Sequence, residues 1–165
     1  MDLGATIVGM TIILMCIIPF VLISRNNRKQ EQKLLEELVS DAEKHHCNIS
    51  RHDFRRNSVI GIDDNARMAF FAGKVKNEQV RQHIRLAEIQ KCRVINSGRI
   101  VHHSGSNHKV IEKIEMAFTF QNKNQPEALL EFYNRDYDSP TLTGELQLAE
   151  KWCKIFNDKI SVTAA

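Results

Sequence analysis

The stretch LGATIVGMTIILMCIIPFVLIS at residues 3–24 contains no charged side chain, and it decides the architecture of the chain. As an α-helix with a rise of 1.5 Å per residue it is about 33 Å long, which is enough to cross a hydrocarbon core of about 30 Å. Gly9 and Pro19 lie inside the run, but helices in lipid carry both residue types more often than soluble helices do. The run therefore predicts a transmembrane anchor over residues 1–24.

Other interpretations of this run fit the sequence less well. A secretory signal peptide has a cationic segment before its apolar core and small residues at its cleavage site. Here the only charged residue ahead of the run is Asp2, and the chain reads Val-Leu-Ile-Ser directly before Arg25. A lipoprotein signal requires a small residue before its cysteine, whereas Met15 precedes Cys16. A buried helix of a soluble domain is rarely this long without one charge.

The charges that flank the run predict its orientation. Arg25, Arg28 and Lys29 follow it directly, whereas the other side offers only Asp2 and the chain terminus. By the positive-inside rule, the chain after the run faces the cytoplasm. We therefore expect a single-pass protein of the cell inner (cytoplasmic) membrane with a cytoplasmic C-terminal domain.

Size, charge and cysteine content narrow the class of protein. Residues 48–165 are numerous enough to bury one core, so we expect a single domain there. All 23 Lys and Arg residues lie after the run, whereas one of the 20 Asp and Glu residues, Asp2, lies before it. The part of the chain after the run therefore has a net charge of +4 with histidine neutral. This charge is too mild and too dispersed to predict nucleic-acid binding. The cysteines beyond the run show no paired spacing, which favours a reducing compartment: Cys47, Cys92 and Cys153.

Residues 25–47 predict a helical stalk next to the membrane. The stretch is polar, contains neither Gly nor Pro, and carries apolar side chains at helical spacing: Leu34, Leu35, Leu38, Val39 and Ala42. This stripe covers little more than two turns, which is too short for a coiled coil. It is expected to pack either on the sheet of its own domain or on the same stretch of a second copy.

From residue 58 onward the hydrophobic period changes to two, which indicates antiparallel strands. Strands are expected at residues 58–63 and 67–72, joined by the turn formers of residues 63–66, and at residues 80–86, 92–95, 114–120 and 128–133. The pattern is clearest at residues 114–120, where Ile114, Met116, Phe118 and Phe120 share one face. Residues 97–99 and 104–106 are expected to be short loops. Either a seventh strand lies between residues 47 and 56, or the sheet is open.

An amphipathic helix is predicted to close the chain. Thr141 and Thr143 are candidate N-caps, and Glu145 lies in the first turn, where a helix dipole favours an acid. One face of the helix is apolar, and we expect it to lie in the core: Leu146, Ala149, Trp152, Cys153, Phe156 and Ile160. Trp152 is therefore assigned no binding role.

Successive antiparallel strands followed by one amphipathic helix resemble the pleckstrin-homology-like barrel, whose last helix plugs an open end. The segments LEFYN at residues 130–134 and GELQLAEKW at residues 144–152 also resemble those of uncharacterised bacterial single-pass membrane proteins. The resemblance covers residues 58–160. It implies an antiparallel sheet or partly open barrel of about six to seven strands under a C-terminal helix. With the transmembrane helix and the stalk predicted from the residues, the expected fold class is α+β. It implies no catalytic residues, and such a fold selects no ligand by itself.

No motif in the sequence predicts a reaction. Asp136 and Asp138 have the spacing of a metal-binding pair, but they lie among turn-forming residues. Two groups of histidines could suggest a soft metal, namely His45, His46 and Cys47 with His52, and His102 and His103 with His108. Neither group has the Cys-x-x-Cys or helical His-x-x-x-His spacing of common zinc sites, so solvated histidines are the simpler interpretation. We expect no enzyme, no cofactor and no metal, with a metal protein or enzyme as a remote alternative.

Two basic clusters are the candidate binding residues. Arg25, Arg28 and Lys29 flank the membrane, and each cation near an anionic leaflet contributes about 1 kcal/mol to adhesion. Arg51, Arg55 and Arg56 lie between stalk and sheet, where they could bind a lipid headgroup or a partner, although solvation is the simpler interpretation. An upright stalk of about 20 residues would hold this second cluster roughly 30 Å from the bilayer, beyond the screening length of about 8 Å.

The leading expectation is a membrane-tethered, non-enzymatic interaction or scaffold module. It would bind an unknown protein partner or self-associate at the cytoplasmic membrane face, through an exposed edge strand and the stalk. Anchoring favours such contacts because it raises the effective concentration at the membrane. The alternative is a module that binds anionic lipid headgroups through the second basic cluster.

Overall fold

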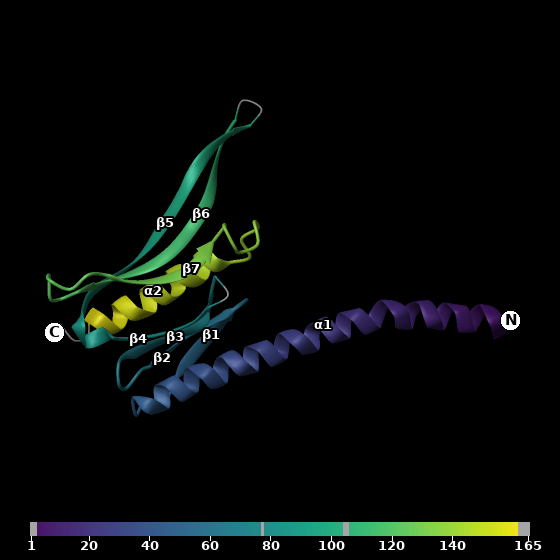
Figure 1. Cartoon of the computed structure of the whole chain (residues 1–165), viewed down its shortest axis with the longest axis horizontal. Helices are drawn as coiled ribbons and strands as arrows, with labels where there is room; N and C mark the ends of the chain where they lie inside the picture. Colours follow the sequence, from purple (N-terminus) through teal and green to yellow (C-terminus); the bar gives the residue numbers. More distant parts are fainter. Residues whose placement is uncertain (1–2, 77, 104–105, 162–165) are drawn as a thin grey trace.

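The chain is described by a computed structural model that places the backbone of residues 3–76, 78–103 and 106–161, with the side chains of these residues except 3–14, 16–24, 101–103 and 106–109. It is an α+β protein with a long N-terminal helix, antiparallel strands in two sheets and a C-terminal helix (Figure 1). The elements in chain order are α1 (Leu3–Lys44), β1 (Arg51–Arg55), β2 (Ser58–Asp63), β3 (Met68–Val75), β4 (Glu78–Arg85), the 3-10 helix η1 (Leu86–Glu88), β5 (Ile89–His103), β6 (Ser106–Phe120), β7 (Ala128–Asn134) and α2 (Glu145–Ser161).

Both sheets are meanders, in which each strand pairs with the next strand of the chain. The first sheet has the order β1-β2-β3-β4 and the second has the order β5-β6-β7, with η1 between them. Strand β1 lies between residues 47 and 56, where the sequence allowed a seventh strand as one of two alternatives. The predicted antiparallel architecture under a C-terminal helix is thus confirmed, with seven strands divided between two sheets.

Alternation along β2 and β3 divides their side chains between two hydrophobic cores. Ile60, Ile62 and Phe71 point into the larger core, which they share with side chains of the second sheet and of α2. Helix α2 lies between the two sheets in Figure 1, and its Trp152 and Phe156 are almost fully buried there. The intervening residues of β2 and β3 face the other way and form a second core: Val59, Met68, Phe70 and Ala72.

The C-terminal part of α1 covers this second core. Leu38 and Ala42 are each only 1% exposed and pack on the outer face of the first sheet. Gly61 of β2 permits the close approach, because a Cβ atom there would lie 2.9 Å from Leu38 Cδ2. Within this chain, the apolar stripe of the predicted stalk therefore packs on its own domain, and only residues 25–33 of the stalk are exposed on every side.

The predicted anchor at residues 1–24 falls, apart from Met15, on positions whose side chains are not described. In the described part of the chain, no helix is both long enough and apolar enough to cross a membrane. The anchor therefore stays a prediction of the sequence.

Two local predictions are wrong. Helix α2 begins at Glu145 and is preceded by Gly144. The φ of Gly144 is 110°, a value that glycine adopts readily, and its carbonyl accepts the Leu148 N–H at 3.0 Å. Neither predicted threonine caps the helix, because Thr143 instead donates from its backbone N–H and its hydroxyl to the Glu145 carboxylate.

Residues 97–99 lie within β5 rather than in a loop, and the pairing of β5 with β6 shifts its register between Ser97 and Gly98. The other predicted loop covers residues 104–106, and the structure does not describe residues 104 and 105.

Candidate functional site

Arg51, the first of the predicted binding arginines, is held by an acid of its own sheet. Its Nε and Nη2 atoms donate to the two carboxylate oxygens of Asp64 at 3.0 and 2.7 Å. Lys159 of α2 reaches the same carboxylate at 2.8 Å. Hydrogen bonds from Arg51 and Lys159 lower the pKa of Asp64. Arg51 thus fastens β1 to the turn between β2 and β3, and α2 is fastened to the same turn.

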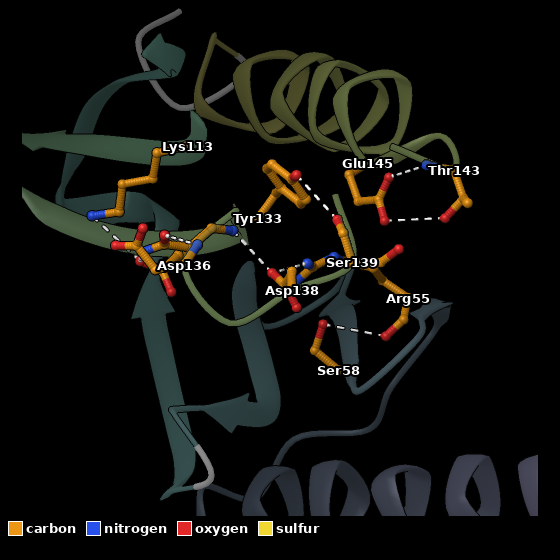
Figure 2. A network of polar contacts seen from close by, with 11 residues as sticks. Arg55, Ser58, Lys113, Tyr133, Asp136, Asp138, Ser139, Thr143 and Glu145 are labelled. Carbon is orange, nitrogen blue, oxygen red and sulfur yellow. Dashed lines mark hydrogen bonds and ion pairs between the residues drawn. The ribbon is translucent and has the colours of Figure 1, made fainter. Parts of the chain in front are cut away.

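The ion pair of Arg55 is more deeply buried than that of Arg51. Its Nη2 donates to Asp138 Oδ2 at 2.9 Å, and the two side chains are only 13% and 17% exposed. Burial lowers the pKa of the Arg55 guanidinium, and the negative charge of Asp138 opposes that shift. Asp138 also accepts the backbone N–H of Asn134 at 2.9 Å, within the network of polar contacts shown in Figure 2. The predicted acidic pair at Asp136 and Asp138 is therefore part of a turn, in which Asp138 holds an arginine.

The three arginines do not converge on one site. Arg51 and Arg55 lie at the two ends of β1, about 13 Å apart at 3.3 Å per residue. Arg56 is exposed in the turn that follows, with a φ of 20°. To bind a headgroup phosphate, several hydrogen-bond donors must lie close together without being paired with acids. Because Arg51 and Arg55 are paired with Asp64 and Asp138, this cluster would offer a phosphate mainly Arg56.

The cations that were predicted to flank a membrane lie on the exposed part of α1. Arg25, Arg28 and Lys29 are all exposed. The first helical residue packed against the domain is Leu34. The nine residue steps from Arg25 to Leu34 span about 14 Å of helix. If the bilayer ends near Arg25, the domain stands much closer to the lipid than the roughly 30 Å expected for a free stalk.

The first of the two histidine groups is not brought together as one cluster in the structure. The ring of His52 lies edge-on to Phe54 on β1. Cys47 is buried, with its Sγ at 3.4 Å from the carbonyl oxygen of His45 and at 3.4 Å from Met68 Sδ, and burial raises the pKa of its thiol. His45 instead lies beside His83 of β4, with ring centroids 4.0 Å apart. The side chains of His102, His103 and His108 lie outside the description.

Sequence reasoning missed the neighbourhood of His45. Asp41 precedes His45 by four residues, a spacing that places both on one helical face, and this signal was present in the sequence. The contribution of His83 had no such signal, because it depends on β4 lying next to the end of α1.

The second sheet continues into a two-stranded arm, defined here as residues 97–103 of β5 and 106–111 of β6. The two strands stay paired as far as His103 and Ser106. Strand β7 pairs with β6 only between Lys113 and Phe118, so no other described strand borders the arm. Figure 1 shows the arm projecting away from both helices. Ile100 on the arm is 63% exposed.

No family model, no curated protein and no solved structure matches this chain. The fold and these surfaces define an α+β domain with two projections, namely the N-terminal part of α1 and the arm of the second sheet.

Proposed function

We propose that this chain is a membrane-tethered, non-enzymatic interaction module. It binds a protein partner or a second copy of itself at the cytoplasmic face of the inner membrane. Its domain belongs, in this proposal, to the pleckstrin-homology-like class. A four-strand meander, a three-strand meander and a C-terminal helix packed between them support that class.

The arm carries the proposal. A two-stranded ribbon is marginally stable in water by itself, and both of its edges present unpaired backbone N–H and C=O groups. The arm nevertheless extends past the end of β7 and exposes Ile100. A strand from a partner would pair with such an edge, and the apolar side chain would be covered in the same contact.

The membrane anchor in this proposal is supported by the sequence alone. The uncharged run at residues 3–24 is long enough for one span, and Arg25, Arg28 and Lys29 follow it. Confinement to the membrane raises the effective concentration of the arm for a partner in the same membrane. The alternative of headgroup binding loses support, because Arg51 and Arg55 are paired with Asp64 and Asp138.

Photo-crosslinking of the full chain in native membranes tests the proposal. A photoreactive amino acid replaces Ile100 in one variant and Leu129 in the other, because Leu129 is also an exposed apolar residue (45%) but lies on β7. We expect an adduct from position 100, either with another protein or with a second copy, and little or none from position 129. Two differently tagged copies distinguish self-association from partner binding.

The proposal also predicts that Ile100→Lys prevents the contact and that Leu129→Lys leaves it intact. Equal adducts from both positions, or none from position 100, would overturn the assignment to the arm. A chain that external protease digests in intact cells would overturn the cytoplasmic location.

A further inference from the structure

Three side chains with metal-binding atoms converge where α1 ends on the first sheet. Asp41 lies in the last turns of α1, His45 follows the helix, and His83 lies on the edge strand β4. One ligand atom from each residue lies within 4.8 Å of the others. His83 Nδ1 is 3.8 Å from Asp41 Oδ2, and the two imidazole rings have centroids 4.0 Å apart.

The backbone around this cluster is fixed by packing. Phe70 of β3 is directly opposite His83 in the sheet register and is only 1% exposed beneath α1. Its ring centroid lies 6.3 Å from that of His45 and 6.4 Å from that of His83, so it supports both imidazoles from below.

A second set of contacts fixes α1 along β4. One turn before Asp41, Glu37 accepts a hydrogen bond from Gln79 at 2.9 Å and pairs with Arg81 at 3.8 Å. Gln79, Arg81 and His83 alternate along the same face of β4. The cluster therefore lies next to these contacts, on the same face of β4.

We propose that Asp41, His45 and His83 form a binding site for a divalent transition-metal ion that fastens the end of α1 to β4. Two imidazoles and one carboxylate suit zinc and its neighbours, whereas Mg²⁺ and Ca²⁺ prefer sites built of oxygen ligands. Ligands of a tetrahedral zinc ion with bonds of about 2.0–2.1 Å lie about 3.4 Å apart, so the observed separations require only small side-chain rotations.

The exposure of the site agrees with this chemistry. His45 and His83 are exposed and Asp41 is half-buried, so an ion can enter from solvent and water can take a fourth position. Because the ligands come from two elements, the ion binds the docked helix better than the undocked one. Metal binding then stabilises the packing of α1 on the sheet by mass action. This inference does not depend on the partner of the arm.

The test uses the full chain in detergent, stripped of metal, and titrates Zn²⁺ by calorimetry with Co²⁺ absorption as the spectroscopic probe. We expect one ion per chain and the visible spectrum of tetrahedral Co²⁺. Even outer-shell partners of metal sites contribute about ten- to a hundredfold in affinity, so His45→Ala and His83→Ala should each weaken binding by at least that much. Zinc at a hundredfold excess over Kd should raise Tm by roughly 5–10 °C in the native protein.

His46→Asn is the matched control. His46 is adjacent and exposed but outside the cluster, and asparagine tolerates its φ of 56°. This variant should keep the affinity and the Tm shift. The proposal fails if native protein binds no ion, if His46→Asn loses binding as His45→Ala does, or if zinc raises Tm equally in His83→Ala. Comparing each variant with and without zinc separates ligation from any structural effect of the substitution.

Discussion

Strand β2 of the first sheet and residues 97–100 of the arm both lie in antiparallel pairs, but they are buried to opposite extents. Every residue of β2 is buried, because α1 covers one face of the sheet and α2 with the second sheet covers the other. Among the described strands, no third one lies along the arm, and its Ile100 is largely exposed. Strand pairing alone therefore does not distinguish a core from a projection, whereas the layers on its faces do.

The largest effect is expected where α1 closes the second core. Leu38→Ala removes a side chain that is 1% exposed and leaves a cavity against Gly61, at a cost of about 2–5 kcal/mol. Denaturant unfolding of the full chain, followed through the single, buried Trp152, measures it. Leu35→Ala is the control, since Leu35 is half-buried on the same helix and should cost clearly less. Equal losses would mean that α1 does not dock as described.

An intermediate, pH-dependent effect is expected at Asp63, at the end of β2. Its buried carboxylate accepts the backbone N–H groups of Asn48, Asn65 and Ala66 at 2.6, 2.8 and 2.9 Å. Burial by itself raises the pKa of Asp63, but these hydrogen bonds outweigh it, and the net shift is downward. The resulting stabilisation is complete above the unfolded pKa of about 3.9 and is lost as the pH falls through the lower pKa of the folded state.

Asp63→Asn should therefore destabilise the chain by about 1–3 kcal/mol at neutral pH and should flatten the loss of stability below about pH 4. Unfolding curves at several pH values check both parts. Asp158→Asn, at an exposed position of α2, should leave the pH profile nearly unchanged. An unaltered profile in Asp63→Asn would show that this carboxylate is not the one that titrates.

The smallest effect on stability is expected at the arm. Ile100→Ala changes an exposed side chain that is not part of either core, so the free energy of unfolding should change by no more than about 0.5 kcal/mol. The same unfolding assay measures it. A loss above about 1 kcal/mol in the isolated chain would show that the arm is covered without a partner.

Much of the local structure could be predicted from the sequence. The strand at residues 114–120 and the apolar face of α2 follow from side-chain periodicity, which is a property of neighbouring residues. The length of β5 and β6 could not be predicted, because residues 97–99 carry turn-forming residue types and show no hydrophobic alternation. Their strand conformation comes from pairing with β6.

In the candidate sites, too, some features could be predicted from neighbouring residues, whereas others depend on residues far apart in the chain. The sequence alone placed Arg51 and Arg55 near the stalk, but only the fold gave them Asp64 and Asp138 as partners, the second of them 83 residues away. The i, i+4 spacing of Asp41 and His45 also places both on one helical face, but sequence reasoning did not single them out, because His83 joins them only through the position of β4 beside the end of α1.

By itself the sequence determined the uncharged run, the period of most strands and the apolar faces of both helices, since these depend on residues a few positions apart. The tertiary structure alone decided which face of the first sheet α1 covers, which arginines are neutralised, and which part of the second sheet projects. The physical reason is that burial and ion pairing depend on what lies across from a side chain, and residues distant in the chain supply those neighbours.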